Sequence, residues 1–270
     1  MELYLGTGGY SNDDWQGLIY PAGTKPSQYL NLYAAHFNAV ELNSSFYAIP
    51  GIRAFEGMVK KSGGRVRFAI KAHRSITHER DADGEMYQRL FESVAPLRDV
   101  GMLGPFLAQF PYSFHRTREN RRYLKGVVER FAAAGEILAV EFRHGSWESE
   151  EVVESFRDFG VIAVSVDYPP LRGLPGPGLK VTGPIAYARL HGRNRAKWWD
   201  GKSAAERHDY RYEPDELRPW VEWIVEREGE LEQVYLMMQN TTRGHALFNL
   251  VMLRELFGEL GIEVDVNLEL

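Results

Sequence analysis

Charged and amide side chains recur along this chain where short apolar runs end. In chain order they are Glu41 and Asn43, Lys71 and His73, Gln109, Glu141 and Arg143, Asp167, Arg189 and His191, and Asn240. Carboxylates and imidazoles transfer protons, whereas lysine, arginine and amide groups bind anionic or hydroxyl-bearing molecules. A parallel barrel gathers the carboxyl ends of its strands around one mouth. We therefore expect one site there, acting by acid/base chemistry on a small polar substrate.

Four of these side chains are the predicted catalytic groups: Glu41, Glu141, Asp167 and His191. Burying a glutamate within a strand without a partner is costly, which favours a functional role for Glu41. The structural alternative for Glu41 is a carboxylate satisfied by backbone amides. For Glu141 the alternative is an ion pair with Arg143 or Lys71 that holds the rim of the barrel.

The other polar groups are predicted to bind and orient the substrate: Asn43, Lys71, His73, Gln109, Arg143, His144, Arg189 and Asn240. Lysine and arginine neutralise phosphate or carboxylate charge, and we expect Lys71, Arg143 and Arg189 to do so. A Schiff-base role for Lys71, or an ion pair with Glu41 or Glu141, are the alternatives.

The cofactor is not determined by the sequence. Glu, Asp and His side chains at strand ends are metal ligands in other barrels, so a divalent metal is one alternative. It is not favoured, because no HxH or HExxH spacing occurs and several cations would compete with the ion. We therefore predict no metal ligands.

The segment 192–213 follows the seventh apolar run and is long for a connection. It contains six Lys or Arg residues together with Trp198, Trp199, Tyr210 and Tyr212. Cations interleaved with aromatic rings are typical of single-stranded nucleic-acid binding. They are also typical of a lid whose rings pack on the barrel, and the acidic net charge of the chain favours the lid.

The apolar runs predict eight strands, which alternate with amphipathic helical stretches. The expected strands are 3–7, 39–43, 66–71, 104–109, 138–142, 161–167, 185–191 and 234–240. Helices are expected after Pro26, after a cap at Ser146, after Pro214 and around Leu247. The segment 168–184 is rich in Pro and Gly, so an irregular crossover should replace the helix between strands 6 and 7.

Strand parity favours a closed barrel over an open doubly wound sheet, which is the serious rival. Small residues share a face with the polar strand ends: Ala69 with Lys71, Ala139 with Glu141, and Ala163 and Ser165 with Asp167. We expect these faces to line the barrel interior and the bulky opposite faces to contact the helices. The fold class is thus α/β, a single TIM-type (β/α)8 barrel over residues 1–270.

The composition is that of a folded protein with a sizeable core. The 270 residues are 44% hydrophobic and carry a formal net charge of −5, which argues against binding nucleic acid or anionic membranes over the whole surface. Cysteine is absent, which excludes disulfides and a cysteine nucleophile. No apolar run reaches the length of a membrane span and no signal peptide is evident, so a cytoplasmic location without membrane contact is expected.

Several motifs together resemble the YecE-like family, whose domain is known as domain of unknown function 72. The motifs are Gly6-Thr7-Gly8-Gly9-Tyr10, Val40-Glu41-Leu42-Asn43, Gln109-Phe110-Pro111, Val140-Glu141-Phe142-Arg143-His144 and Arg189-Leu190-His191-Gly192-Arg193. The resemblance covers almost the whole chain. It implies a TIM-type barrel but supplies no reaction.

The functional expectation is an enzyme that acts on a small polar or anionic substrate bearing a sugar, phosphate or carboxylate group. Hydrolase, isomerase and lyase chemistry are not distinguished. One alternative is a nucleic-acid-binding or processing barrel, in analogy to apurinic endonucleases. The other is a ligand sensor without catalysis.

Overall fold

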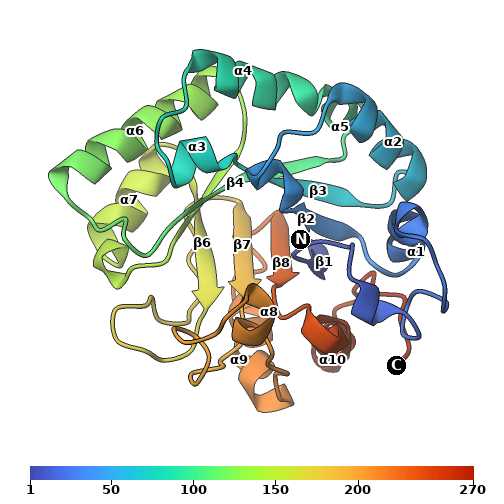
Figure 1. Cartoon of the computed structure of the whole chain (residues 1–270). Coiled ribbons are helices and arrows are strands. Elements are labelled where there is room, and N and C mark those ends of the chain that lie inside the picture. Colours follow the sequence, from blue (N-terminus) through green and yellow to red (C-terminus); the bar gives the residue numbers. More distant parts are fainter.

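The computed structural model of residues 1–270 is a closed barrel of eight parallel strands in the order β1 to β8 (Figure 1). The strands are β1 (Glu2–Thr7), β2 (Ala39–Leu42), β3 (Arg67–Lys71), β4 (Leu103–Phe110), β5 (Leu138–Phe142), β6 (Ile162–Asp167), β7 (Ile185–Leu190) and β8 (Gln233–Met238). β8 pairs with β1 over its whole length and closes the ring. The predicted barrel is confirmed, and each predicted strand is present to within two residues at either end.

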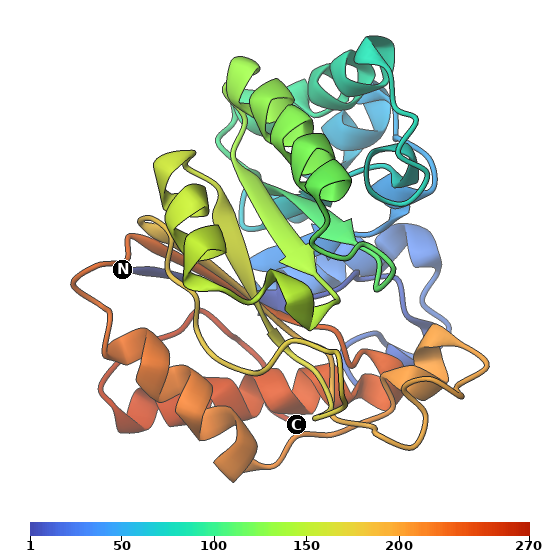
Figure 2. The same ribbon diagram turned by 90° about the vertical axis from the view of Figure 1, so that its left-hand side faces the viewer.

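The helices lie outside the strands. They are α1 (Tyr29–His36), α2 (Ile52–Ser62), α3 (Arg74–Thr77), α4 (Gly84–Ser93), α5 (Ala95–Asp99), α6 (Arg118–Ala133), α7 (Glu150–Asp158), α8 (Ala204–Arg207), α9 (Pro214–Val225) and α10 (His245–Glu259). Helices α9 and α10 contact each other and lie on the opposite side of the barrel from α4 and α6 (Figure 2). No helix is long and apolar enough to cross a membrane.

The connections between the strands agree with those predicted from the sequence, with one correction. No helix joins β6 to β7, so the predicted irregular crossover is confirmed. Pro214 begins α9, where its missing N–H costs no hydrogen bond. Ser146, however, does not cap a helix: it lies in a short 3-10 turn and accepts a hydrogen bond from the Arg116 backbone N–H, while Ser149 precedes α7.

The core has two layers. Outside the strands, bulky side chains such as Phe68, Ile70 and Val140 pack against the helices. Inside the barrel, small side chains such as Ala39, Ala69 and Ala139 lie beside larger ones. The larger side chains are Tyr4, Leu107, Ile162, Val164, Val166, Tyr187, Tyr235 and Met237. Small residues on some strands make room for large ones on others, as in other filled barrels.

The neighbouring strands β1 and β2 approach each other closely at Gly6. A Cβ atom built on Gly6 would lie 1.9 Å from the Ala39 carbonyl oxygen. Only glycine permits this approach, so Gly6 belongs to barrel closure rather than to a phosphate-binding loop.

Candidate functional site

The strand register determines which polar side chains point into the barrel. In a parallel sheet, residues paired on neighbouring strands point to the same face, and residues two apart along a strand share that face. Glu41 pairs with the interior residue Ala69, Glu141 with Gln109, and Arg189 with Met237. These polar groups therefore lie above the interior apolar layer, at the carboxyl ends of the strands.

A buried arginine joins two of the predicted catalytic carboxylates. Arg189 is only 2% exposed, and both glutamates are fully buried. Its Nε donates to Glu41 Oε2 at 2.8 Å and its Nη2 to Glu41 Oε1 at 2.6 Å, while Nη1 binds Glu141. Burial disfavours the guanidinium charge, but Glu141 and Glu41 hold the pKa of Arg189 well above its usual value. The arginine is thus committed to protein carboxylates.

Two tyrosines and a glutamine complete this group. The Tyr187 hydroxyl donates to Glu41 Oε2 at 2.9 Å, the Tyr168 hydroxyl donates to Glu141 Oε1, and Gln239 Oε1 accepts from Arg189 Nη2 at 2.9 Å. We call Glu41, Glu141, Tyr168, Tyr187, Arg189 and Gln239 the inner polar cluster. Tyr168, Tyr187 and Gln239 were not among the predicted site residues. Tyr187 could have been predicted, because it lies two residues from Arg189 and four from His191 and so shares their face of the strand.

The charge state of Glu141 follows from its partners. Burial raises the pKa of this carboxyl, but Arg189, His191 and Arg143 lower it, and the result lies well below the usual range. Arg143 Nε lies 3.7 Å from Glu141 Oε1, so the predicted Glu141–Arg143 ion pair is present alongside the stronger one to Arg189. Glu141 is therefore an ionised, fully engaged carboxylate at neutral pH.

His191 lies against this cluster and against the cavity. Its Nε2 is 3.6 Å from Glu141 Oε1 and 3.5 Å from Arg189 Nη1, and its buried Nδ1 has no hydrogen-bond partner. Burial lowers the pKa of His191 well below its usual value, and Arg189 adds to this effect. At neutral pH the ring is neutral, so one ring nitrogen donates a hydrogen bond and the other can accept one.

A cavity of about 600 Å³ opens above the cluster at the carboxyl ends of the strands. Of the residues predicted to form the site, Asn43, Lys71, Gln109, Arg143, Arg189 and His191 line it. Phe46, Tyr47, His78, Arg207, His208 and Gln239 are among the other lining residues. Glu41 and Glu141 do not line the cavity. Glu41 contacts Arg189, and Glu141 contacts Arg189 and His191, both of which do line it.

Lys71 lines the cavity without a carboxylate partner. Its Nζ donates to Gln109 Oε1 at 3.1 Å and lies 4.7 Å from the centre of the Phe46 ring. Burial, together with the charges of Arg189 and Arg143, lowers the pKa of Lys71 to about 7. The predicted ion pair of Lys71 with Glu41 or Glu141 does not form. An amine that titrates near neutral pH can both donate and accept a proton.

Asp167 lies on the other side of the barrel wall. β6 pairs Val166 with the interior residue Arg189 and Asp167 with Leu190, so Asp167 points outward. The predicted orientation of the 163, 165 and 167 face was therefore wrong: Val164 and Val166 fill the interior, where β2, β3 and β5 contribute the small side chains Ala39, Ala69 and Ala139.

Outside the barrel, Asp167 is fully bonded. Arg193 donates to both of its oxygens, at 2.8 and 2.7 Å, and Tyr212 and Trp220 donate at 3.1 and 3.0 Å. Asn240 also faces outward and donates to the Tyr210 carbonyl and to Asn249 Oδ1. We call Asp167, Arg193, Tyr212, Trp220, Asn240 and Asn249 the outer polar cluster. It holds the segment 192–213 against the barrel.

Two predicted binding histidines also lie outside the cavity lining. His73 caps α3 by accepting from the Ser75 backbone N–H. His144 stacks on His115 with ring centres 3.8 Å apart, and its Nδ1 accepts from the Ser146 backbone N–H. Both side chains serve local structure at the rim. No group of three or more His, Asp or Glu side chains is arranged to hold a metal ion.

The segment 192–213 covers one side of the cavity. Ala204, Ala205 and Arg207 from α8, and His208 after it, line the cavity, which the sequence could not show. In Figure 1, α8 lies beside the carboxyl ends of β7 and β8. Trp198 is 2% exposed and packs on Tyr168, whereas Trp199 is exposed. The segment is thus packed on the site through one of its two tryptophans.

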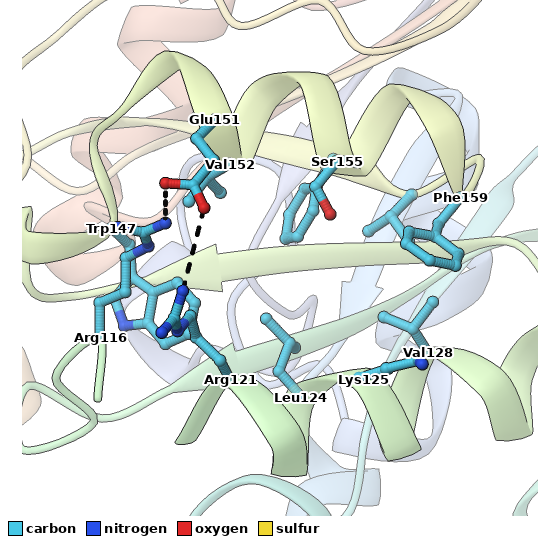
Figure 3. A pocket seen from close by; sticks show the side chains of 12 residues that line it. Arg116, Arg121, Leu124, Lys125, Val128, Trp147, Glu151, Val152, Ser155 and Phe159 are labelled. Atoms are coloured by element: carbon cyan, nitrogen blue, oxygen red, sulfur yellow. Dashed lines mark hydrogen bonds and ion pairs between the residues drawn. The ribbon is translucent and has the colours of Figure 1, made fainter. Parts of the chain in front are cut away.

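A second cavity lies between α6 and α7, away from the strand ends (Figure 3). It measures about 260 Å³ and its floor is apolar, with Leu124, Val128 and Phe156 among its residues. Its two arginines, Arg116 and Arg121, both pair with Glu151. It lacks the titratable groups of the first cavity, so we place the candidate site at the mouth.

The fold and the cavity define a β/α-barrel protein with a polar site at the carboxyl mouth. The family model described as protein of unknown function DUF72 matches residues 4–267, and the chain belongs to this family. The prediction that the chain contains domain of unknown function 72 is thereby confirmed.

The chain is similar to three relatives over most of its length. The UPF0759 protein YunF of Bacillus subtilis is 32% identical over 264 residues, 92% of each chain. A DUF72 family crystal structure from Thermotoga maritima is 35% identical, with a TM-score of 0.85 over 96% of this chain and 99% of that one. One from Enterococcus faecalis is 26% identical, with a TM-score of 0.85 over 99% of both.

Proposed function

We propose that the protein is an enzyme that performs acid/base chemistry on a small anionic substrate bound in the mouth cavity. The observation that carries the proposal is the desolvated Lys71 amine, with its pKa near 7, which lines a cavity of substrate size together with a neutral His191. Groups poised to exchange protons near neutral pH concentrate at catalytic sites. Lys71 is the proton-transferring group in this proposal, and His191, whose pKa is lowered well below its usual value, forms a hydrogen bond with the substrate as a neutral ring.

The inner polar cluster positions these groups. Glu41 and Glu141 are fully buried and engaged with Arg189, so they act on the substrate through Arg189 and His191 rather than by touching it. Asn43, Gln109 and Arg143 face the cavity and orient the substrate. Asp167, Asn240, His73 and His144 have structural partners elsewhere, and the proposal gives them no contact with substrate.

The first experiment is a ligand screen followed by a turnover assay. Purified protein is screened by thermal shift against sugar phosphates, organic acids and nucleotides, and each stabilising compound is incubated with the enzyme and followed by NMR. We expect turnover of at least one compound. Binding without any turnover would contradict the proposal and would instead support a ligand sensor.

Two variants of Lys71 separate charge from proton transfer. Lys71→Arg keeps the cation but cannot give up its proton at neutral pH, whereas Lys71→Met removes both functions. We expect Lys71→Arg to bind the substrate and to lose about 10²–10⁴-fold in kcat, and Lys71→Met to lose binding as well. A normal kcat in Lys71→Arg would overturn the proton-transfer role.

A further inference from the structure

We propose that the cavity binds a phosphoryl group between Lys71, Arg143 and Arg207, and that this group fixes the 192–213 segment over the site. The inference rests on the proposed function of the same cavity and names its substrate class, a phosphate monoester. The three cationic side chains come from three separate places: the end of β3, the residue after β5, and α8.

The three side chains have donors that the protein leaves unused. Arg207 forms no ion pair and no side-chain hydrogen bond, and its guanidinium lies over the Trp198 ring at 5.8 Å. Arg207 Nε is buried without an acceptor, and Arg143 Nε is buried with Glu141 Oε1 3.7 Å away, beyond hydrogen-bond distance. Lys71 Nζ has only the Gln109 amide oxygen. Buried donors of charged groups are costly to leave unpaired, which points to a ligand that accepts from them.

Arg189 provides the contrast within the same wall. Its guanidinium has four acceptors on three protein side chains, and two of those side chains are carboxylates. The protein thus neutralises Arg189 itself and leaves Lys71 and Arg207 without a carboxylate.

The unused cations are close enough to repel one another. Burial, and then the charge of Arg143, lowers the pKa of Arg207. Burial lowers the pKa of His78 to about 4, with Lys71 and Arg143 adding to the effect, and the pKa of His208 is likewise lowered to about 4 by burial and by Arg143. Arg143 is therefore the centre of a positive field that a bound anion would relieve.

The arrangement fits a phosphoryl group better than a carboxylate. A carboxylate has two oxygens in one plane and is satisfied by one bidentate arginine. A phosphoryl group carries nearly two charges at neutral pH and three acceptor oxygens that point in different directions. Three cations from three elements line one cavity and can approach such a group from different sides, and the cavity beside Phe46 and Tyr47 leaves space for the organic part of an ester.

The position of Arg207 couples this anion to the segment 192–213. Arg207 is the last residue of α8, and Ala204 and Ala205 of the same helix also line the cavity. A group that bonds to Arg207 and Arg143 together links α8 to the barrel strands. We therefore expect the segment to become more protected when the phosphoryl group binds.

The test is calorimetric titration of the full chain with inorganic phosphate, glucose 6-phosphate, glucose and acetate. We expect both phosphorylated probes to bind, the ester more tightly than the inorganic ion, and glucose and acetate to bind at least about tenfold more weakly. Arg207→Gln and Arg143→Gln should each weaken binding of the ester by about tenfold or more, because each removes a charge-assisted hydrogen bond. Hydrogen exchange of residues 192–213 should slow in the presence of glucose 6-phosphate in the wild type only.

The matched control is Arg195→Gln, an exposed arginine of the same segment that does not line the cavity. It should bind both phosphorylated probes within about twofold of wild type. Circular dichroism spectra verify that each variant is folded. Equal binding of acetate, or wild-type affinity in Arg207→Gln, would overturn the phosphoryl site. These results are separable from the proposed function, because turnover of an unphosphorylated compound would preserve the enzyme and remove only this inference.

Discussion

The inner and outer polar clusters both pair carboxylates with an arginine near the carboxyl end of the barrel, yet they differ in their surroundings. In the inner cluster, Glu41 and Glu141 hold Arg189 beside an open cavity. In the outer cluster, Asp167 holds Arg193 in a place filled by Tyr212 and Trp220. The difference is strand parity: one step along the strand moves a carboxylate from the site to the scaffold. A polar strand end in a barrel is thus a functional candidate only when it faces inward.

The largest expected effect comes from breaking the inner cluster. Arg189→Met leaves Glu41 and Glu141 buried without their cation, and removal of one partner from a buried ion pair typically costs about 3–5 kcal/mol. We expect a loss of this size in the free energy of unfolding, measured by urea denaturation. Adding Glu41→Gln and Glu141→Gln to the same chain should recover part of the loss, because no charge is then buried unpaired. If the single Arg189→Met variant were as stable as wild type, the ion pairs of Arg189 with Glu41 and Glu141 would not be needed to offset the burial of the two carboxylates.

Asp167→Asn tests the outer cluster and should have a smaller effect. An amide nitrogen would replace an oxygen that accepts from Arg193 and from either Trp220 or Tyr212, whereas Arg193 keeps its second partner, Glu216, at 3.2 Å. We expect about 2–3 kcal/mol of destabilisation. Limited proteolysis should cut the segment 192–213 faster, and the pKa of Lys71 should stay near its wild-type value. Wild-type rates of cleavage within 192–213 in Asp167→Asn would contradict the anchoring role of the outer cluster.

A pair of tyrosines inside the barrel sharpens the comparison further. Tyr187 and Tyr235 are both buried and stacked with ring centres 5.7 Å apart, but only the Tyr187 hydroxyl donates to a carboxylate. Tyr187→Phe should cost about 1.5–2 kcal/mol, the range for a hydrogen bond to a charged group, and Tyr235→Phe should cost less than about 0.5 kcal/mol. Equal losses of stability in thermal unfolding experiments would mean that the hydrogen bond from Tyr187 to Glu41 contributes nothing beyond packing.

The strands and the barrel were predictable because their signals are local. Alternating apolar runs and a Pro- and Gly-rich break lie within single segments, so β1 to β8 and the irregular crossover needed no knowledge of distant contacts. The convergence of Glu41, Glu141, Arg189 and His191 also followed, because barrel closure brings all strand ends to one mouth.

The remainder of the site depends on long-range packing. Both faces of β6 are compatible with the interior, and the choice is made by side chains on other strands and by Trp220, 53 residues away from Asp167. Asn240 was predicted where its neighbour Gln239 faces the cavity, a difference of one residue in register. Arg207 and His208 reach the cavity only because the outer cluster anchors their segment, and no local pattern indicates this.

Lys71 should also make the stability of the chain depend on pH. The pKa of Lys71 is about 7 in the folded chain, whereas an unfolded lysine titrates near 10.4. Between these two values the unfolded chain binds more protons, so the free energy of unfolding should rise with pH by at most about 1.4 kcal/mol per pH unit from this group. Below pH 7 both states are protonated and the contribution is constant. Lys71→Met should lack this component when urea unfolding is compared from pH 6 to 10, and an identical slope in both proteins would contradict it.

The proton affinity of Lys71 itself tests the proposed site most directly. Lysine labelled with ¹³C at the ε carbon reports the charge of each amine by NMR, and the Lys71 signal is assigned by its loss in Lys71→Arg. We predict a midpoint near pH 7 for this one lysine, shifted upward when inorganic phosphate is added. A midpoint near 10.4 in the free protein would mean that the amine is well solvated and that the mouth is not the proton-transfer site described above.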